Sequence, residues 1–147
     1  QAPTASHFLI LLARTAQDVR YDSSYVHQQL SQVQGWPEEM IPPRIDRLKS
    51  FQADDLDILK SDRAMFDWAC RQAYIALGNM MLSAALLGVD SCPMEGSHRE
   101  QLEQTLSEAG VLDRAHFGVA CMAAFGYRVK EPRKKTRQTP QQVIQWV

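Results

Sequence analysis

The sequence is short of the features that define several common classes of protein. It has three cysteines in 147 residues and no C-x-x-C pair, so neither a disulfide framework nor a zinc site is indicated. Its net charge of −1 gives no overall attraction for nucleic acid or for an anionic membrane. A P-loop, a G-x-G-x-x-G fingerprint and a G-x-S-x-G elbow are all missing, so a Rossmann dehydrogenase or a classical hydrolase has no support.

Metal and membrane signals are equally sparse. Cys70 and Cys121 lie in apolar runs, and we expect them to be reduced core thiols in a cytoplasmic protein. The most apolar stretch, Ala73–Val89, is interrupted by Asn79 and Ser83 and is slightly short of the roughly 20 residues that cross a bilayer. The start has neither Met nor the basic region of a signal peptide, as if the chain began mid-protein. The scattered histidines, which form no His-x-x-x-His pair and are expected to be structural, are His7, His27, His98 and His116.

What is present is enough apolar sequence for one packed domain over residues 1–147. Hydrophobic residues make up 45% of the chain and charged residues 22%. The continuous apolar run Phe8–Ala13 predicts a strand buried on both faces, and the apolar run Phe117–Gly126 is a second strand candidate. A helix apolar on nearly every face is predicted over Trp68–Leu87, and such a helix is usually buried. Further helices are predicted over Ser24–Val33, from Pro43 to about Phe51, and over Arg99–Ala109.

The segment Val89-Asp-Ser-Cys-Pro-Met-Glu-Gly96 is the most informative part of the chain. It reads as the end of a strand that breaks into a tight loop. Pro93 has no N–H, and Gly96 would let a ligand approach the backbone closely. From these residues alone, Glu95-Gly96 could present backbone N–H groups to a ligand ring or could form an ordinary turn.

A second candidate is the basic loop Arg128–Arg137, which contains one acid, Glu131. Lys135 and Arg137 could bind a phosphate as a point charge and a forked donor. The loop could equally be a solvated basic segment, and it lacks the interleaved aromatic residues that favour nucleic-acid binding. The apolar tail Val143–Val147 needs a surface to pack on, such as a partner subunit.

The run from Trp68 to Gly96 reads Trp-Ala-x-Arg-Gln-Ala-Tyr-Ile-Ala-Leu-Gly-Asn-Met-Met-Leu-x-Ala-Ala-x-Leu-Gly-x-Asp-Ser-Cys-Pro-Met-Glu-Gly. This run resembles the central helix and following strand of the nitroreductase family of FMN-dependent oxidoreductases. Ala5-Ser-His7 with the apolar run that follows resembles the preceding family strand, and Lys135-Thr-Arg137-x-x-Pro140 resembles the closing phosphate-side motif. The resemblance covers most of the chain.

The resemblance implies an α+β fold, with a mixed central sheet wrapped by helices and a long buried central helix. It also implies an intertwined homodimer with two FMN sites at its interface. The implied cofactor-binding residues are Pro93, Met94, Glu95 and Gly96 at the isoalloxazine ring, Lys135 and Arg137 at the FMN phosphate, and Gln1 near the pyrimidine edge. No metal and no side-chain nucleophile is expected, because the flavin carries the chemistry.

The implied activity is a ping-pong hydride transfer from NAD(P)H through flavin N5 to acceptors such as nitroaromatics or quinones. The chain departs from the family in two ways. The N-terminal part of the family fold, with other phosphate contacts, is missing from this sequence, and Ser97 stands where an aromatic residue is common. The alternative is a dimeric binding module without enzymatic activity, whose basic loop binds an anion or nucleic acid.

Overall fold

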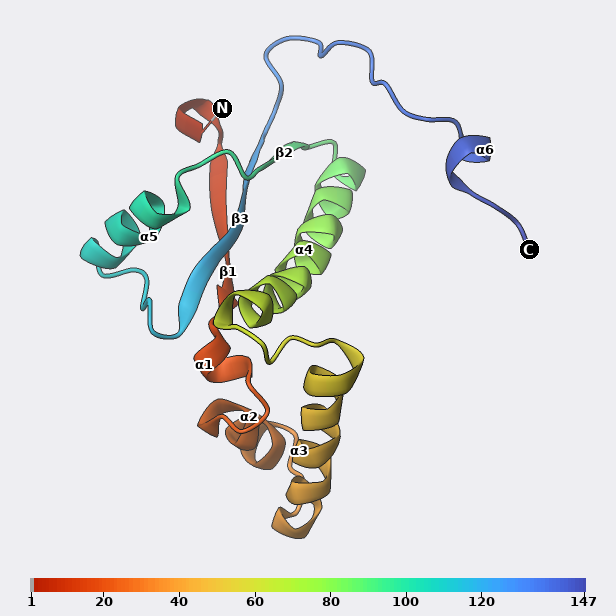
Figure 1. Cartoon of the computed structure of the whole chain (residues 1–147). Coiled ribbons are helices and arrows are strands. Elements are labelled where there is room, and N and C mark those ends of the chain that lie inside the picture. The colour runs from red at the N-terminus through yellow and green to blue at the C-terminus, as the bar shows by residue number, and fades with distance from the viewer. Residues whose placement is uncertain (1) are drawn as a thin grey trace.

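The computed structural model describes residues 2–147 (Figure 1), so Gln1 lies outside the described residues and its predicted contact with FMN is not placed. In chain order the elements are η1 (Ala2–Thr4), β1 (His7–Arg14), α1 (Ala16–Val19), α2 (Ser24–Gln28), η2 (Gln29–Val33), η3 (Glu38–Met40), α3 (Ile41–Ser50), η4 (Phe51–Asp55), α4 (Asp62–Leu86), β2 (Asp90–Met94), α5 (Arg99–Glu108), β3 (Phe117–Gly126) and α6 (Pro140–Val143).

The three described strands form one sheet in the order β1-β3-β2, and both pairings are antiparallel. The two apolar runs predicted as strands are therefore strands, and they pair with each other. The prediction that the first run is buried on both faces is wrong for the single chain, since Phe8, Leu9 and Leu12 of β1 are 37–38% exposed. The β1–β3 ladder shifts register between Leu11, opposite Cys121, and Leu12, opposite Val119, so Ala120 is a bulge residue. The sheet and its surrounding helices confirm the α+β class, although the described strands include no parallel pair.

Helix α4 contains the predicted central helix and begins earlier, at Asp62. The Ser61 hydroxyl caps it by accepting a hydrogen bond from the Ala64 N–H at 3.1 Å. Gly88 follows its end with a φ of 73°, a backbone conformation that glycine adopts without strain. Figure 1 shows the helix crossing beside the sheet, where Leu77 packs with Cys121 and Ala123 in the core.

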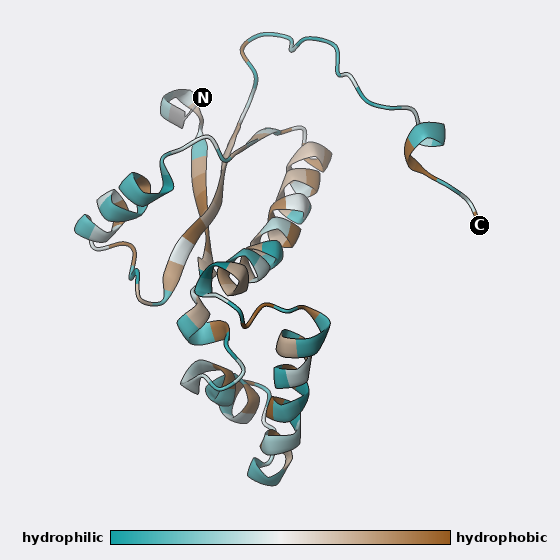
Figure 2. Ribbon diagram, viewed as in Figure 1, coloured by the Kyte–Doolittle hydropathy of each residue, from teal (hydrophilic) through white to brown (hydrophobic). Residues whose placement is uncertain are grey.

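Within one chain only one face of α4 is buried, the face of Met65, Ala69, Leu77 and Ala84. The side chains of Ile75, Leu82, Leu86 and Leu87 are all at least 60% exposed. Figure 2 shows hydrophobic residues continuing along this helix and the strands, whereas α5 is mostly hydrophilic. Within residues 2–147, no helix combines the length and the apolar character that a bilayer span requires.

The segment between β1 and α4 is helical, as predicted, and includes two π-helices. Helix α3 begins at Ile41, so Pro42 and Pro43 lie in its first turn, where a missing N–H costs nothing. The π-helix η4 continues α3 and buries Gln52 completely. The Gln52 side chain donates to the Val19 carbonyl at 2.8 Å and accepts from the Tyr21 N–H at 2.9 Å. This side chain fastens α3–η4 to the end of α1.

Gly118 in β3 is the position where a side chain is least tolerated. A Cβ there would lie 2.7 Å and 2.9 Å from two ring carbons of Phe66 and 3.2 Å from Glu103 Oε1. We expect Gly118→Val to lower the free energy of unfolding by about 1–3 kcal/mol, because the Phe66 ring must move out of its packing position. Gly78→Ala is the control: nothing lies within 4 Å of its Cβ, and alanine favours the helix. Urea denaturation of both variants tests the prediction, and equal losses would contradict it.

Candidate functional site

Strand β2 lies at an edge of the sheet, and the Pro93–Gly96 segment ends it. On its inner side β2 pairs with β3, with Pro93 opposite Ala123 and Met94 opposite Met122. No other described strand pairs with its outer side. Pro93 and Gly96 are exposed and Met94 is half-buried. The four residues predicted to line a flavin ring therefore form one accessible edge of backbone.

The turn that follows β2 is held from two sides. The Ser97 N–H donates to the Glu95 carbonyl at 2.7 Å, which closes a tight turn around Gly96. The Tyr74 hydroxyl, on α4, donates to Glu95 Oε1 at 2.6 Å. That hydrogen bond, assisted by burial, raises the pKa of Tyr74 well above its ordinary value, so the phenol stays neutral and remains a donor. The sequence alone does not reveal this role of Tyr74, because a bond across 21 residues leaves no trace in local spacing.

A cavity of about 320 Å³ opens beside this turn. Its lining combines the carboxylate of Glu95 with two arginines and two thiols, and the two thiols are Cys70 and Cys121. The residues that line it are Arg63, Asp67, Cys70, Tyr74, Met94, Glu95, Ser97, Arg99, Val119, Ala120, Cys121 and Met122. Cys121 is buried, as predicted for a core thiol, whereas Cys70 is only half-buried.

Cys70 should react slowly despite lining the cavity. Burial, aided by the nearby charge of Asp67, raises the pKa of its thiol to about 11. Only the thiolate is nucleophilic, and an ordinary thiol is already partly ionised at about pH 8. We therefore expect iodoacetamide to alkylate Cys70 slowly at that pH, and the rate to rise steadily toward pH 11. Asp67→Asn should raise the alkylation rate of Cys70. The rate measured in unfolded protein serves as the reference for an unperturbed thiol. Alkylation of folded Cys70 as fast as that of the unfolded chain would contradict this expectation.

The basic loop joins the sheet at one point. Arg128 makes two parallel contacts to Asp90 at the start of β2: Nε to Oδ2 at 2.8 Å and Nη2 to Oδ1 at 2.6 Å. This fork lowers the pKa of the Asp90 carboxyl, with a smaller contribution from the charge of Lys135.

Beyond Arg128 the chain leaves the sheet and runs away from the other elements to α6 (Figure 1). Arg137 donates to the Thr136 carbonyl at 2.8 Å. Among residues 2–147, no hydrogen bond or ion pair joins Lys135 or Arg137 to Pro93–Gly96. The structure therefore brings together the ring-side residues of the predicted site but not its two phosphate-side residues.

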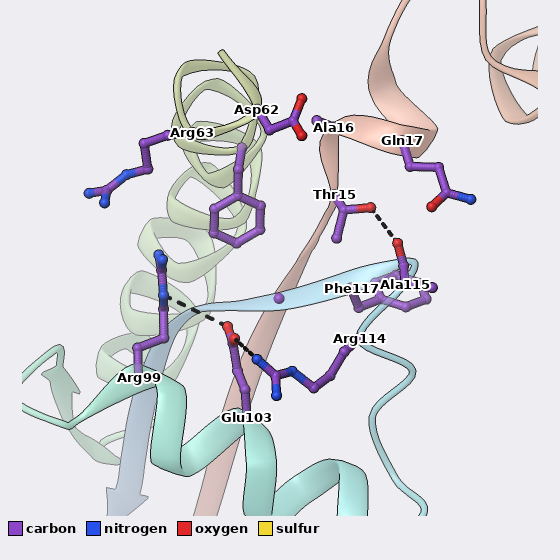
Figure 3. Close-up of a pocket in the computed structure, with 12 residues that line it drawn as sticks. Thr15, Ala16, Gln17, Asp62, Arg63, Arg99, Glu103, Arg114, Ala115 and Phe117 are labelled. Carbon is purple, nitrogen blue, oxygen red and sulfur yellow. Dashed lines mark hydrogen bonds and ion pairs between the residues drawn. The ribbon is translucent and has the colours of Figure 1, made fainter.

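A second pocket, of about 500 Å³, lies between α4, α5 and the start of β3 (Figure 3). Glu103 points into it and is buried; it accepts a hydrogen bond from the Val119 N–H at 2.8 Å. Figure 3 shows Arg99 and Arg114 on either side of this carboxylate, at 3.8 Å and 3.9 Å. The charge of Glu103 is balanced by the two arginines, and its oxygen holds the β3 backbone. We therefore assign Glu103 a structural role and no role in binding or catalysis.

Comparison with known proteins decides the family. The model of the family described as "Nitroreductase family" matches residues 44–127, which is more than half of the chain. The chain belongs to the nitroreductase family. It is 47% identical over its full length to a Bacillus subtilis protein named "Putative NAD(P)H nitroreductase YfkO", and it spans 66% of that relative.

Solved structures agree with this nitroreductase fold. A nitroreductase family protein from Streptococcus pneumoniae superposes with a TM-score of 0.68 at 15% identity, over 99% of this chain and 66% of that one. A protein from Exiguobacterium sibiricum, described as in complex with FMN, superposes with a TM-score of 0.62 at 15% identity, over 97% of this chain and 63% of that one. The chain thus spans about two thirds of the length of the nitroreductases it matches.

The region that matches the nitroreductase family contains α4, Tyr74, β2 and the turn through Gly96. Lys135 and Arg137 follow it, and Gln1 precedes it. The ring-side residues therefore lie within the family match, while the three other predicted cofactor contacts lie outside it.

Proposed function

We propose that this protein is an FMN-dependent NAD(P)H oxidoreductase. The observation that carries the proposal is the Pro93–Gly96 turn, an accessible backbone edge held by Tyr74 beside an open cavity. The names of the NAD(P)H nitroreductase relative and of the FMN-bound structural neighbour support the same cofactors. We also propose that residues 1–147 all belong to one nitroreductase-type domain, since β1 pairs with a strand inside the family match.

The residues present fit a flavin ring. Nothing lies within 4 Å of where a Cβ on Gly96 would be, so a flat ring can approach the backbone there. Pro93, Met94, Glu95 and Gly96 would line the ring. Lys135 and Arg137 would hold the phosphate, and Gln1 would lie near the pyrimidine edge. When bound, FMN would supply hydride transfer from NAD(P)H through N5 to a nitroaromatic or quinone acceptor, in a ping-pong sequence.

We further propose a homodimer in which the exposed apolar residues of α4 and of the tail pack against the partner. Leu82, Leu86, Val143 and Trp146 would be costly to leave in water at these exposures. A partner would also bring a second basic loop, and with it the positive charge that one chain does not place beside Pro93–Gly96. The free thiols of Cys70 and Cys121 suit a reducing compartment such as the cytoplasm.

The test is the visible absorption spectrum of the purified protein before and after incubation with FMN and removal of the excess. Retained flavin that bleaches anaerobically with NADH or NADPH, and recovers on adding a quinone, is the expected result. A folded protein that retains no flavin at any FMN concentration would overturn the proposal. Salt-sensitive binding of an anion by the basic loop, in that case, would favour the non-enzymatic binding module.

Tyr74→Phe tests the turn directly. The variant keeps the ring but removes the donor to Glu95, so we expect FMN affinity to fall by about tenfold, the cost of a hydrogen bond to a charged group. The turn should also loosen without flavin, and the Ser97 amide should exchange its hydrogen faster. Tyr127→Phe, at an exposed tyrosine, is the control. Unchanged exchange at Ser97 would contradict the role of Tyr74 whether or not the protein binds flavin.

A further inference from the structure

A groove of about 670 Å³ lies between η2 and the α3–η4 helix, in a part of the chain that the proposed flavin site does not use. It has apolar walls and two arginines from the same face of α3, Arg44 and Arg47, with one acid, Asp55. The residues that line it are Val26, Gln29, Leu30, Gln34, Trp36, Arg44, Arg47, Leu48, Ser50, Phe51 and Asp55.

Arg44 is positioned as a receptor for an anion. Its guanidinium carbon lies 3.3 Å from the centre of the Trp36 ring, so the ring holds the planar group in a fixed orientation. Its Nε atom is buried and has no hydrogen-bond partner. Since Nε is enclosed by the protein, the donors that Arg44 can offer to a ligand in the groove are those of its two terminal nitrogens. No ion pair among residues 2–147 includes Arg44 or Arg47.

The apolar walls of the groove favour a ligand with a flat apolar ring. Leu30, Leu48 and Phe51 line the groove opposite or beside the arginine, and Phe51 is fixed by an edge-on contact with Trp68 at 6.2 Å. Apolar walls with one or two convergent polar groups are the usual composition of small-molecule sites. A guanidinium fork pairs with a carboxylate through two parallel hydrogen bonds. Two arginines against Asp55 leave one positive charge in excess, which suits a monoanion.

The backbone of both walls is also unusual. The groove is bordered by η2 (Gln29–Val33) and η4 (Phe51–Asp55), which are both π-helical. Such turns account for well under 1% of residues in proteins and occur frequently at functional sites. This feature is independent of the Arg44 guanidinium, which forms no ion pair among the described residues, and both occur at the same groove.

We propose that this groove is a binding site for a small aromatic monocarboxylate. The carboxylate pairs with the Arg44 guanidinium through its two terminal nitrogens, and Trp36 holds that guanidinium in place. The ring of the ligand packs against Leu48 and Phe51. The proposal does not depend on flavin binding, because the groove contains none of the residues assigned to FMN.

The experiment is calorimetric titration of the purified protein with 2-naphthoate and with its uncharged analogue 2-naphthamide. We expect 2-naphthoate to bind, Arg44→Met to weaken it by about tenfold or more, and Arg44→Lys to recover only part of the loss because lysine lacks the fork. 2-Naphthamide should bind about tenfold more weakly, and Arg44→Met should leave its affinity unchanged.

Arg133→Met is the matched control, because it removes one exposed cation from the basic loop and should leave 2-naphthoate binding unchanged. The visible spectrum of flavin-loaded protein distinguishes binding over the flavin, which would shift the absorption bands, from binding in the groove, which would not. Circular dichroism confirms that the variants are folded. Absence of binding, an unchanged affinity in folded Arg44→Met, or equal affinities for the acid and the amide would each overturn the proposal.

Discussion

Replacing Lys135 and Arg137 together with alanine is expected to weaken FMN binding by about 100-fold or more, since each would lose a charge-assisted contact to the phosphate. Both side chains are exposed, and neither forms an ion pair within the described residues. Their removal should therefore leave the free energy of unfolding of the flavin-free protein almost unchanged. Fluorescence titration of flavin-free protein with FMN measures the loss, and riboflavin, which lacks the phosphate, should bind both proteins equally.

The basic loop supplies its own control. Lys130 and Arg133 are exposed cations of the same loop, and replacing both with alanine removes the same charge. If Lys135 and Arg137 contact the phosphate, the control pair should change FMN affinity little. If both double variants lost the same FMN affinity, the loop would act only through its overall positive charge. The assignment of Lys135 and Arg137 to the phosphate would then be wrong.

Gln52→Leu is expected to lower the free energy of unfolding by about 2–5 kcal/mol, although leucine has nearly the same volume. Gln52 is fully buried, and its amide satisfies both the Val19 carbonyl and the Tyr21 N–H. Leucine leaves two buried backbone groups unpaired, at about 1–3 kcal/mol each. Urea denaturation measures the change.

Gln72→Leu controls for the loss of a glutamine amide, because Gln72 is an exposed residue of α4. We expect its free energy of unfolding to differ from that of the parent by less than about 0.5 kcal/mol. If Gln52→Leu were as mild, water would have to reach Val19 and Tyr21 easily, and Gln52 would not fasten η4 to α1.

The sequence predicted well what local chemistry decides. The apolar run Phe117–Gly126 is β3 to the residue, because strand and run end together where charged residues follow. The Ser61 hydroxyl caps the start of α4, and Gly88 and Gly110 follow the ends of α4 and α5 with the positive φ that glycine adopts without strain. The Pro93–Gly96 loop was likewise recognisable, since proline and glycine act on the backbone of their own residues.

What the sequence did not predict depends on residues far apart in the chain. Gln52 carries no pattern that distinguishes a buried amide from a surface amide, and its partners Val19 and Tyr21 lie on another helix and its connection. The Tyr74–Glu95 bond and the fork from Arg128 to Asp90 are also products of tertiary packing. The resemblance to the nitroreductase family implied that Lys135 and Arg137 belong with the ring-side residues, but it could not show that one chain leaves them apart.

The antiparallel pairing of β1 with β3 has a consequence for how this chain folds. Thr15, just after β1, donates to the Ala115 carbonyl across 100 residues of sequence. Because β1 precedes β3 in the chain, the β1–β3 ladder cannot form until Phe117–Gly126 has left the ribosome, at about 5–20 residues per second. Closing so long a loop before any ladder forms predicts slow folding and a nascent chain with an apolar strand exposed. Refolding should therefore be slower than the helix content suggests, and a chain that ends before Phe117 should be retained by chaperones.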